Sequence, residues 1–93
     1  MQIVKRQRGE TLEVAVAGRL DAHWAEQLSL ELSAVVRGRV RRIVVDLGKV
    51  DFLSSAGIRV LLQQAKQAKA FGGTFRVANP APPVKTVLAL AGL

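Results

Sequence analysis

The sequence has 93 residues, of which 49% are apolar and 23% are charged, and its formal net charge is +7. These proportions are typical of a globular chain and exclude a disordered one, while the length predicts one small domain, residues 1–93. The chain has no cysteine, which excludes a disulfide framework and thiolate chemistry. No stretch approaches the ~20 apolar residues of a membrane span, so we expect a cytoplasmic protein.

The positive charge is concentrated in two short clusters. Their members are Lys5, Arg6 and Arg8 in the first cluster, and Arg37, Arg39, Arg41 and Arg42 in the second. Such clusters attract nucleic acids or anionic membranes. However, no aromatic residue lies within the arginine cluster to stack on a base. We therefore expect a solvated surface that helps an acidic partner to approach, and no direct contact with nucleic acid or membrane.

The N-terminal part of the chain predicts a β-hairpin. Residues 2–7 mix apolar and basic side chains as an edge strand does, and residues 8–10 are typical of a turn. Residues 11–17 then alternate between apolar and polar side chains, which indicates a half-buried strand. We predict a loop at Gly18–Asp21, with Asp21 as the N-cap of the helix that follows.

Two amphipathic helices are predicted on either side of a buried strand. Residues 22–36 and 56–71 carry apolar side chains at three-to-four spacing, and we expect Gly38 to end the first helix and Gly72-Gly73 the second. Between the helices, residues 43–47 form a branched apolar run typical of a strand that is covered on both faces. The apolar face expected for the second helix consists of Ile58, Leu61, Leu62, Ala65 and Ala68.

The C-terminal part predicts one more strand and one short helix. Residues 74–78 form the strand. Residues 79–83 contain three prolines, which cannot start a strand, and are predicted to be a rigid loop. The last helix is expected from Val84 to Ala91, with its end at Gly92.

The order of these elements predicts an α/β fold. Strand, helix, strand, helix, strand implies two right-handed crossovers, and thus a mixed, mostly parallel sheet of about four strands with helices packed on it. The loops at residues 18–21 and 53–57 both leave strands at their carboxyl ends. In a parallel sheet these ends lie at one edge, where open α/β sheets place their binding sites. We therefore expect the two loops to be neighbours.

Few residues are arranged for chemistry. His23 is the only histidine, and it has no serine and acid in a convincing catalytic order. Neither Gly-x-x-x-x-Gly-Lys-Ser/Thr nor Gly-x-Gly-x-x-Gly occurs, so nucleotide binding has no motif. Asp46 and Asp51 are too few carboxylates for a metal site. The sequence therefore predicts no enzyme, no cofactor and no bound metal.

Two hydroxyls stand where the second predicted helix begins, at Ser54 and Ser55. A helix start gathers N–H groups without partners, and its dipole makes that end electropositive. A serine there can cap the helix or carry a phosphate, and general physics alone favours capping. Gly57 lies close by and permits another backbone to approach.

The block from Val45 to Leu61, VDLGKVDFLSSAGIRVL, resembles the signature of STAS domains. More narrowly, it is similar to that of the bacterial anti-sigma factor antagonists, also called anti-anti-sigma factors. Gly18–Asp21 matches the second recurring loop of that family, and Gly72-Gly73 and residues 87–93 also fit. The resemblance thus covers nearly the whole chain.

The resemblance implies a phosphorylation switch. In this family the unphosphorylated antagonist binds a serine-kinase anti-sigma factor and frees the sigma factor. The kinase then uses ATP to phosphorylate one serine, which ends binding, and a PP2C-type phosphatase reverses this. The phosphorylated position lies two residues before the motif glycine, which makes it Ser55, with Ser54 as a minor candidate where many members have aspartate. The expected partner contacts are Asp21, Ser54, Ser55, Gly57 and Arg59.

Alternatives to this interpretation remain within the same fold. Short STAS proteins also serve as regulatory subunits that bind the ATPase of a lipid-transport ABC complex, and such a subunit needs no kinase. Family members commonly continue past the position of Leu93. We therefore expect either a short stand-alone member or an excised domain, in which the missing cover favours a homodimer.

Overall fold

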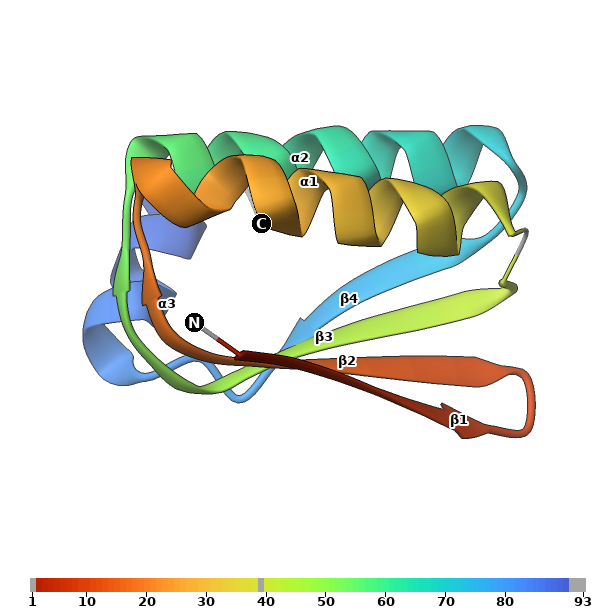
Figure 1. Ribbon diagram of the computed structural model, residues 1–93, viewed down its shortest axis with the longest axis horizontal. Helices are drawn as coiled ribbons and strands as arrows, with labels where there is room; N and C mark the ends of the chain where they lie inside the picture. Colours follow the sequence, from red (N-terminus) through yellow and green to blue (C-terminus); the bar gives the residue numbers. More distant parts are fainter. Residues whose placement is uncertain (1, 39, 91–93) are drawn as a thin grey trace.

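Four strands form one sheet, and two long helices lie side by side across one of its faces (Figure 1). The computed structural model describes residues 2–38 and 40–90. In chain order the elements are β1 (Gln2–Arg8), β2 (Thr11–Leu20), α1 (Ala22–Arg37), β3 (Arg42–Leu53), α2 (Ser55–Ala70), β4 (Thr74–Ala78) and α3 (Pro82–Leu90).

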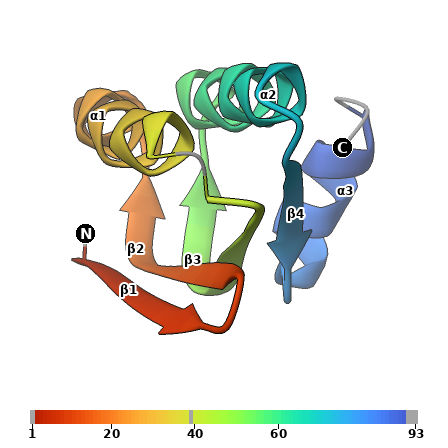
Figure 2. The same cartoon turned by 90° about the vertical axis from the view of Figure 1, so that its right-hand side faces the viewer.

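The sheet has the predicted mixed topology. Its strand order is β1-β2-β3-β4; β1 pairs antiparallel with β2, and the other two pairings are parallel. Helices α1 and α2 make the two crossovers, and both cover the same face, whereas α3 lies beside β4 (Figure 2). The α/β class with a mostly parallel four-stranded sheet is therefore confirmed.

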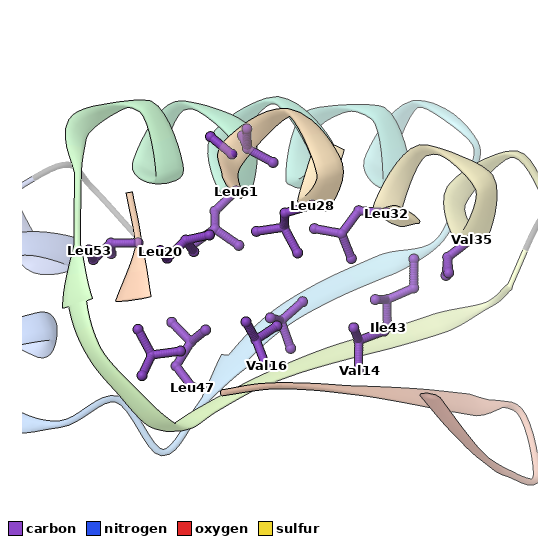
Figure 3. Packing of buried hydrophobic residues seen from close by; sticks show 14 of the residues in the cluster. Val14, Val16, Leu20, Leu28, Leu32, Val35, Ile43, Leu47, Leu53 and Leu61 are labelled. Carbon is purple, nitrogen blue, oxygen red and sulfur yellow. The ribbon is translucent and has the colours of Figure 1, made fainter. Parts of the chain in front are cut away.

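The core lies between the sheet and the two long helices (Figure 3). Alternate residues of β2 and β3 point toward the helices, and leucines at three-to-four spacing on the helices point back, so both periodicities bury one face. The largest fully buried side chains are those of Val14, Val16, Leu20, Leu28, Leu32, Ile43, Val45, Leu47, Val50 and Leu61.

Strands β2 and β3 are longer than the sequence predicts. The predicted loop Gly18–Asp21 is strand as far as Leu20, and β3 continues from Leu47 to Leu53. The two strands stay paired over this extension, with register shifts between Ala15 and Ala17 and between Gly18 and Arg19. A parallel neighbour supplies the hydrogen bonds that keep these glycine-containing segments extended, and a sequence pattern does not reveal that neighbour.

The buried face of α2 also differs from the prediction. Leu62 is 38% exposed, whereas Gln64 is only 5% exposed. The Gln64 amide nitrogen donates a hydrogen bond to the Ser33 hydroxyl of α1 over 3.0 Å. The buried stripe is thus turned toward α1, where Ser33 gives the amide nitrogen of Gln64 a partner, whereas the buried Gln64 Oε1 atom has none among the described residues.

The predicted rigid loop at residues 79–83 is shorter than expected, because α3 begins at Pro82. Proline is tolerated in the first turn of a helix, where its missing N–H has no helical partner to lose. Ala91 and Gly92, the predicted end of this helix, lie outside the described residues.

The core predicts a sharp contrast between two leucines of α1. Leu28 is completely buried and Leu30 is 67% exposed. We expect Leu28→Ala to lower the free energy of unfolding by about 2–5 kcal/mol, because it leaves a cavity. Leu30→Ala should change it by less than about 0.5 kcal/mol. Urea unfolding of both variants measures the difference; equal losses would contradict the packing described here.

Candidate functional site

The carboxyl ends of β2 and β3 meet at one sheet edge, and both long helices begin there (Figure 1). Leu20 and Leu53, the last residues of the two strands, are paired. The Ser54 N–H donates to the Leu20 carbonyl oxygen over 2.9 Å. The predicted proximity of the two segments is therefore confirmed, although each connection is a single residue, Asp21 before α1 and Ser54 before α2.

The two serines have different surroundings. Ser54 has extended backbone angles, and its hydroxyl oxygen accepts a hydrogen bond from the Gly57 N–H over 3.1 Å, so it is the N-cap of α2. Ser55 is the first residue of the helix, and it is exposed. Its hydroxyl takes part in none of the side-chain hydrogen bonds found within residues 2–38 and 40–90. Capping is thus done by one hydroxyl, and the neighbouring hydroxyl remains accessible.

Gly57 lets the first turn of α2 lie directly against the paired strand ends. A Cβ atom at this position would stand 2.9 Å from Leu20 Cγ and 2.9 Å from Leu53 Cδ1. Real side chains do not approach so closely, and both leucines are buried. Gly57 is itself buried. It therefore sets the position of the helix start that carries Ser55.

Asp21 is the N-cap of α1, as predicted. Its Oδ1 atom accepts a hydrogen bond from the Trp24 N–H over 3.2 Å, and the residue is half-buried. The His23 and Trp24 rings meet edge to face, 4.9 Å apart. Arg59 is exposed one turn after Ser55. The structure therefore brings Asp21 and the first turn of α2 to the same edge of the sheet.

The electrostatics of this edge differ from those of the opposite end. At this edge the positive ends of the two long-helix dipoles lie side by side, and neither helix has an acidic residue in its first turn. The Asp21 carboxylate, which caps α1, is the acidic group that directly precedes a helix here. Of the residues in the two basic clusters, Arg8 and Arg42 lie at the other end, where β1 ends and where Thr11 and Arg42 begin their strands. Three ion pairs link these clusters to glutamates: Lys5–Glu31 at 2.6 Å, Arg41–Glu10 at 3.8 Å and Arg8–Glu13 at 3.9 Å.

One pair of side chains at this edge was not anticipated from the sequence. The Arg19 guanidinium lies over the Phe52 ring, 4.3 Å from its centroid. The two residues are partners across β2 and β3. Arg19 lies in the predicted loop 18–21, and Phe52 lies beyond the predicted strand 43–47, so the sequence pattern does not reveal their pairing.

Among the residues that the structure describes, no three histidine, cysteine or acidic side chains gather as a metal site would require. Within the same residues, no helix combines the length and apolar character needed to cross a bilayer.

Replacing each serine by alanine separates the two hydroxyls. Ser54→Ala should lower the free energy of unfolding by about 1 kcal/mol, because the Gly57 N–H loses its cap. Ser55→Ala should change it by less than about 0.5 kcal/mol, since an exposed hydroxyl is removed. Thermal unfolding of the pair is the measurement, and a larger loss for Ser55→Ala would reverse the assignment of the cap.

Gly57→Ala is expected to destabilise the fold despite the better helix propensity of alanine. Overpacking costs about 1–3 kcal/mol, whereas the propensity gain is at most about 1 kcal/mol. The net loss should appear as a lower urea midpoint with an unchanged slope. A more stable variant would show that the helix start can move away from Leu20 and Leu53 freely.

Comparison with known proteins identifies the family. The family described as "Mlab, STAS domain" matches residues 3–93. BtrV of Bordetella bronchiseptica, named as an anti-sigma factor antagonist, is 40% identical over 87% of this chain and 70% of its own length. An anti-sigma factor antagonist of Mycobacterium paratuberculosis superposes with a TM-score of 0.88 at 26% identity, covering 98% of this chain and 77% of that one. Phosphorylated SpoIIAA of Bacillus gives 0.77 at 26%, covering 99% and 85%. The chain belongs to the STAS domain family and, within it, to the anti-sigma factor antagonists.

Proposed function

We propose that this antagonist is switched by phosphorylation of Ser55. When unphosphorylated, it binds a serine-kinase anti-sigma factor through the edge of the sheet where α1 and α2 begin, and the sigma factor is released. The observation that carries the proposal is the division between the serines: Ser54 holds the cap, and the Ser55 hydroxyl is exposed beside it. A kinase can therefore reach Ser55 without unfolding the helix start.

The fold itself should tolerate a phosphate at Ser55. Phosphorylation adds about −1.5 to −2 charges and three acceptor oxygens. At the first position of α2 these oxygens lie near N–H groups at the positive end of the helix dipole. Arg59 stands one turn further along the same helix, at the spacing of an i,i+4 ion pair. The phosphorylated chain is therefore expected to keep its structure.

The complex with the kinase should not tolerate a phosphate on Ser55. A dianion buried at an interface without a partner costs on the order of several kcal/mol. Each ~1.4 kcal/mol of lost binding free energy weakens binding tenfold, so a loss of about four times that amount weakens binding about ten-thousand-fold. The charge alone is sufficient to separate the proteins, without a conformational change. A PP2C-type phosphatase that removes the phosphate would restore binding.

Similarity to two relatives supports this proposal. BtrV, 40% identical, is named as an anti-sigma factor antagonist. SpoIIAA has been solved both unphosphorylated and phosphorylated, and this chain resembles both forms. Such relatives make a phosphate on an antagonist of this fold a reasonable expectation for Ser55.

The modification is tested directly by incubation with ATP and purified serine-kinase anti-sigma factors from the same genome. Peptide mass mapping should find one phosphate, on Ser55, and Ser55→Ala should abolish it. Ser54→Ala is the matched control and should still be labelled. A chain that stays unlabelled but binds a transporter ATPase would instead support the lipid-transport alternative.

The switch itself is tested by three variants of known charge. Ser55→Asp should fold normally and lose kinase affinity by at least tenfold, whereas Ser55→Ala should bind constitutively. Ser54→Asp is the sharpest control, because it adds the same charge one residue earlier, where aspartate can still cap the helix. Because Ser54 is itself an expected partner contact, calorimetric titration should show a smaller loss of affinity for Ser54→Asp than for Ser55→Asp. Equal affinities for Ser55→Asp and Ser55→Ala would end the switch hypothesis.

Asp21 provides a further test of the partner-binding edge. Asp21→Ala removes the cap of α1, so we expect the free energy of unfolding to fall by about 1 kcal/mol. If Asp21 also contacts the kinase, calorimetry at a temperature where the variant is folded should show weaker binding. Lower stability with unchanged affinity would leave Asp21 as a cap only.

A further inference from the structure

An exposed aromatic ring lies immediately beside the proposed switch. Phe52 is 39% exposed, although the next residue, Leu53, is only 7% exposed. Ser54 and Ser55 follow directly in the sequence. A partner surface that covers the Ser55 hydroxyl therefore reaches the ring as well.

The ring is already held in place in the unbound protein. Arg19 lies over it at 4.3 Å, across the ladder of β2 and β3. A cation over an aromatic face is weakly attractive when exposed and more strongly attractive when water is removed. Binding therefore costs little side-chain entropy at this position, and it strengthens a contact that already exists.

Next to the ring is a small hollow between the end of β3 and the first turns of α3. Its volume is about 140 Å³, the size of one aliphatic side chain. The lining residues are Asp51, Phe52, Leu53, Pro83, Val84 and Val87. Five of the six are apolar, and Asp51 is the only charged residue among them.

The charges around the hollow indicate the chemistry of its occupant. Arg19 forms none of the ion pairs found in the described part of the chain, so its guanidinium can donate hydrogen bonds to a carboxylate of a partner. Asp51 is exposed and would repel an acidic group on its own side. An apolar side chain with a carboxylate on the Arg19 side thus fits this surface best.

We infer that Arg19, Phe52 and the hollow form the anchor by which the kinase partner is held. An aliphatic side chain of the kinase enters the hollow against Phe52, and a neighbouring carboxylate pairs with Arg19. This inference rests on the proposed function, but it assigns affinity and regulation to different residues. The anchor supplies binding energy, and the charge state of Ser55 decides whether binding occurs. Aromatic and arginine side chains are the usual centres of such binding energy.

Truncating the ring tests the anchor. By calorimetry against a purified serine-kinase anti-sigma factor that binds the wild-type chain, Phe52→Ala should weaken binding about thirtyfold or more. Phe71→Ala is the matched control, because Phe71 is 51% exposed at the opposite end of α2. It should leave the affinity unchanged. Equal effects of the two variants, or no effect of Phe52→Ala, would overturn the inference.

Two further variants keep the test independent of folding. Val87→Phe should fill the hollow and weaken binding although Phe52 is intact, and Arg19→Gln should weaken it severalfold. Thermal unfolding checks that each variant folds. If these variants bind normally while Ser55→Asp does not, the anchor is wrong and the switch stands. If no purified kinase binds the wild-type chain, both the proposed function and the inference fail.

Discussion

The pairing of Leu20 with Leu53 is the constraint on which the rest of the site depends. It brings the ends of two parallel strands together, and the Ser54 N–H closes the contact on the Leu20 carbonyl oxygen over 2.9 Å. Each strand is followed by one capping residue and a helix, so two helix starts must lie side by side. At position 57, glycine is the only residue type that fits this close approach without displacing Leu20 or Leu53. The candidate functional edge is thus a consequence of packing, and the exposed serine occupies a position that the core fixes.

The sequence predicts the elements well because each has a clear period. Alternation in β2 and three-to-four spacing in both long helices follow directly from which faces are buried. The strand ends were less predictable, since Gly18 and Gly48 indicate loops when considered alone. Pairing with a parallel neighbour keeps both segments extended. The face of α2 was missed for a similar reason: Gln64 is buried because Ser33, which is 31 residues earlier, offers it a partner.

The site was predicted in outline but not in its division of roles. Adjacent hydroxyls give the same local signal, so the sequence alone did not settle whether Ser54 or Ser55 caps the helix. The answer lies in one backbone position: Ser54 is extended and Ser55 is helical. The Arg19–Phe52 contact was beyond sequence reasoning, because it depends on a register shift between Gly18 and Arg19. Such shifts leave little trace in a pattern of apolar and polar residues.

Because the cap of α2 is a serine, the cap adds no negative charge to the helix start before phosphorylation. An aspartate cap would place a negative charge at the start of α2 before any kinase acted, and a phosphate would then meet a like charge one residue away. With Ser54 as the cap, the first turn of α2 carries no acidic residue. A phosphate on Ser55 would therefore be the only anion on that turn. Arg8 and Arg42, by contrast, lie at the opposite end of the sheet, where β1 ends and β3 begins. The change in charge would thus be located at the proposed partner-binding edge.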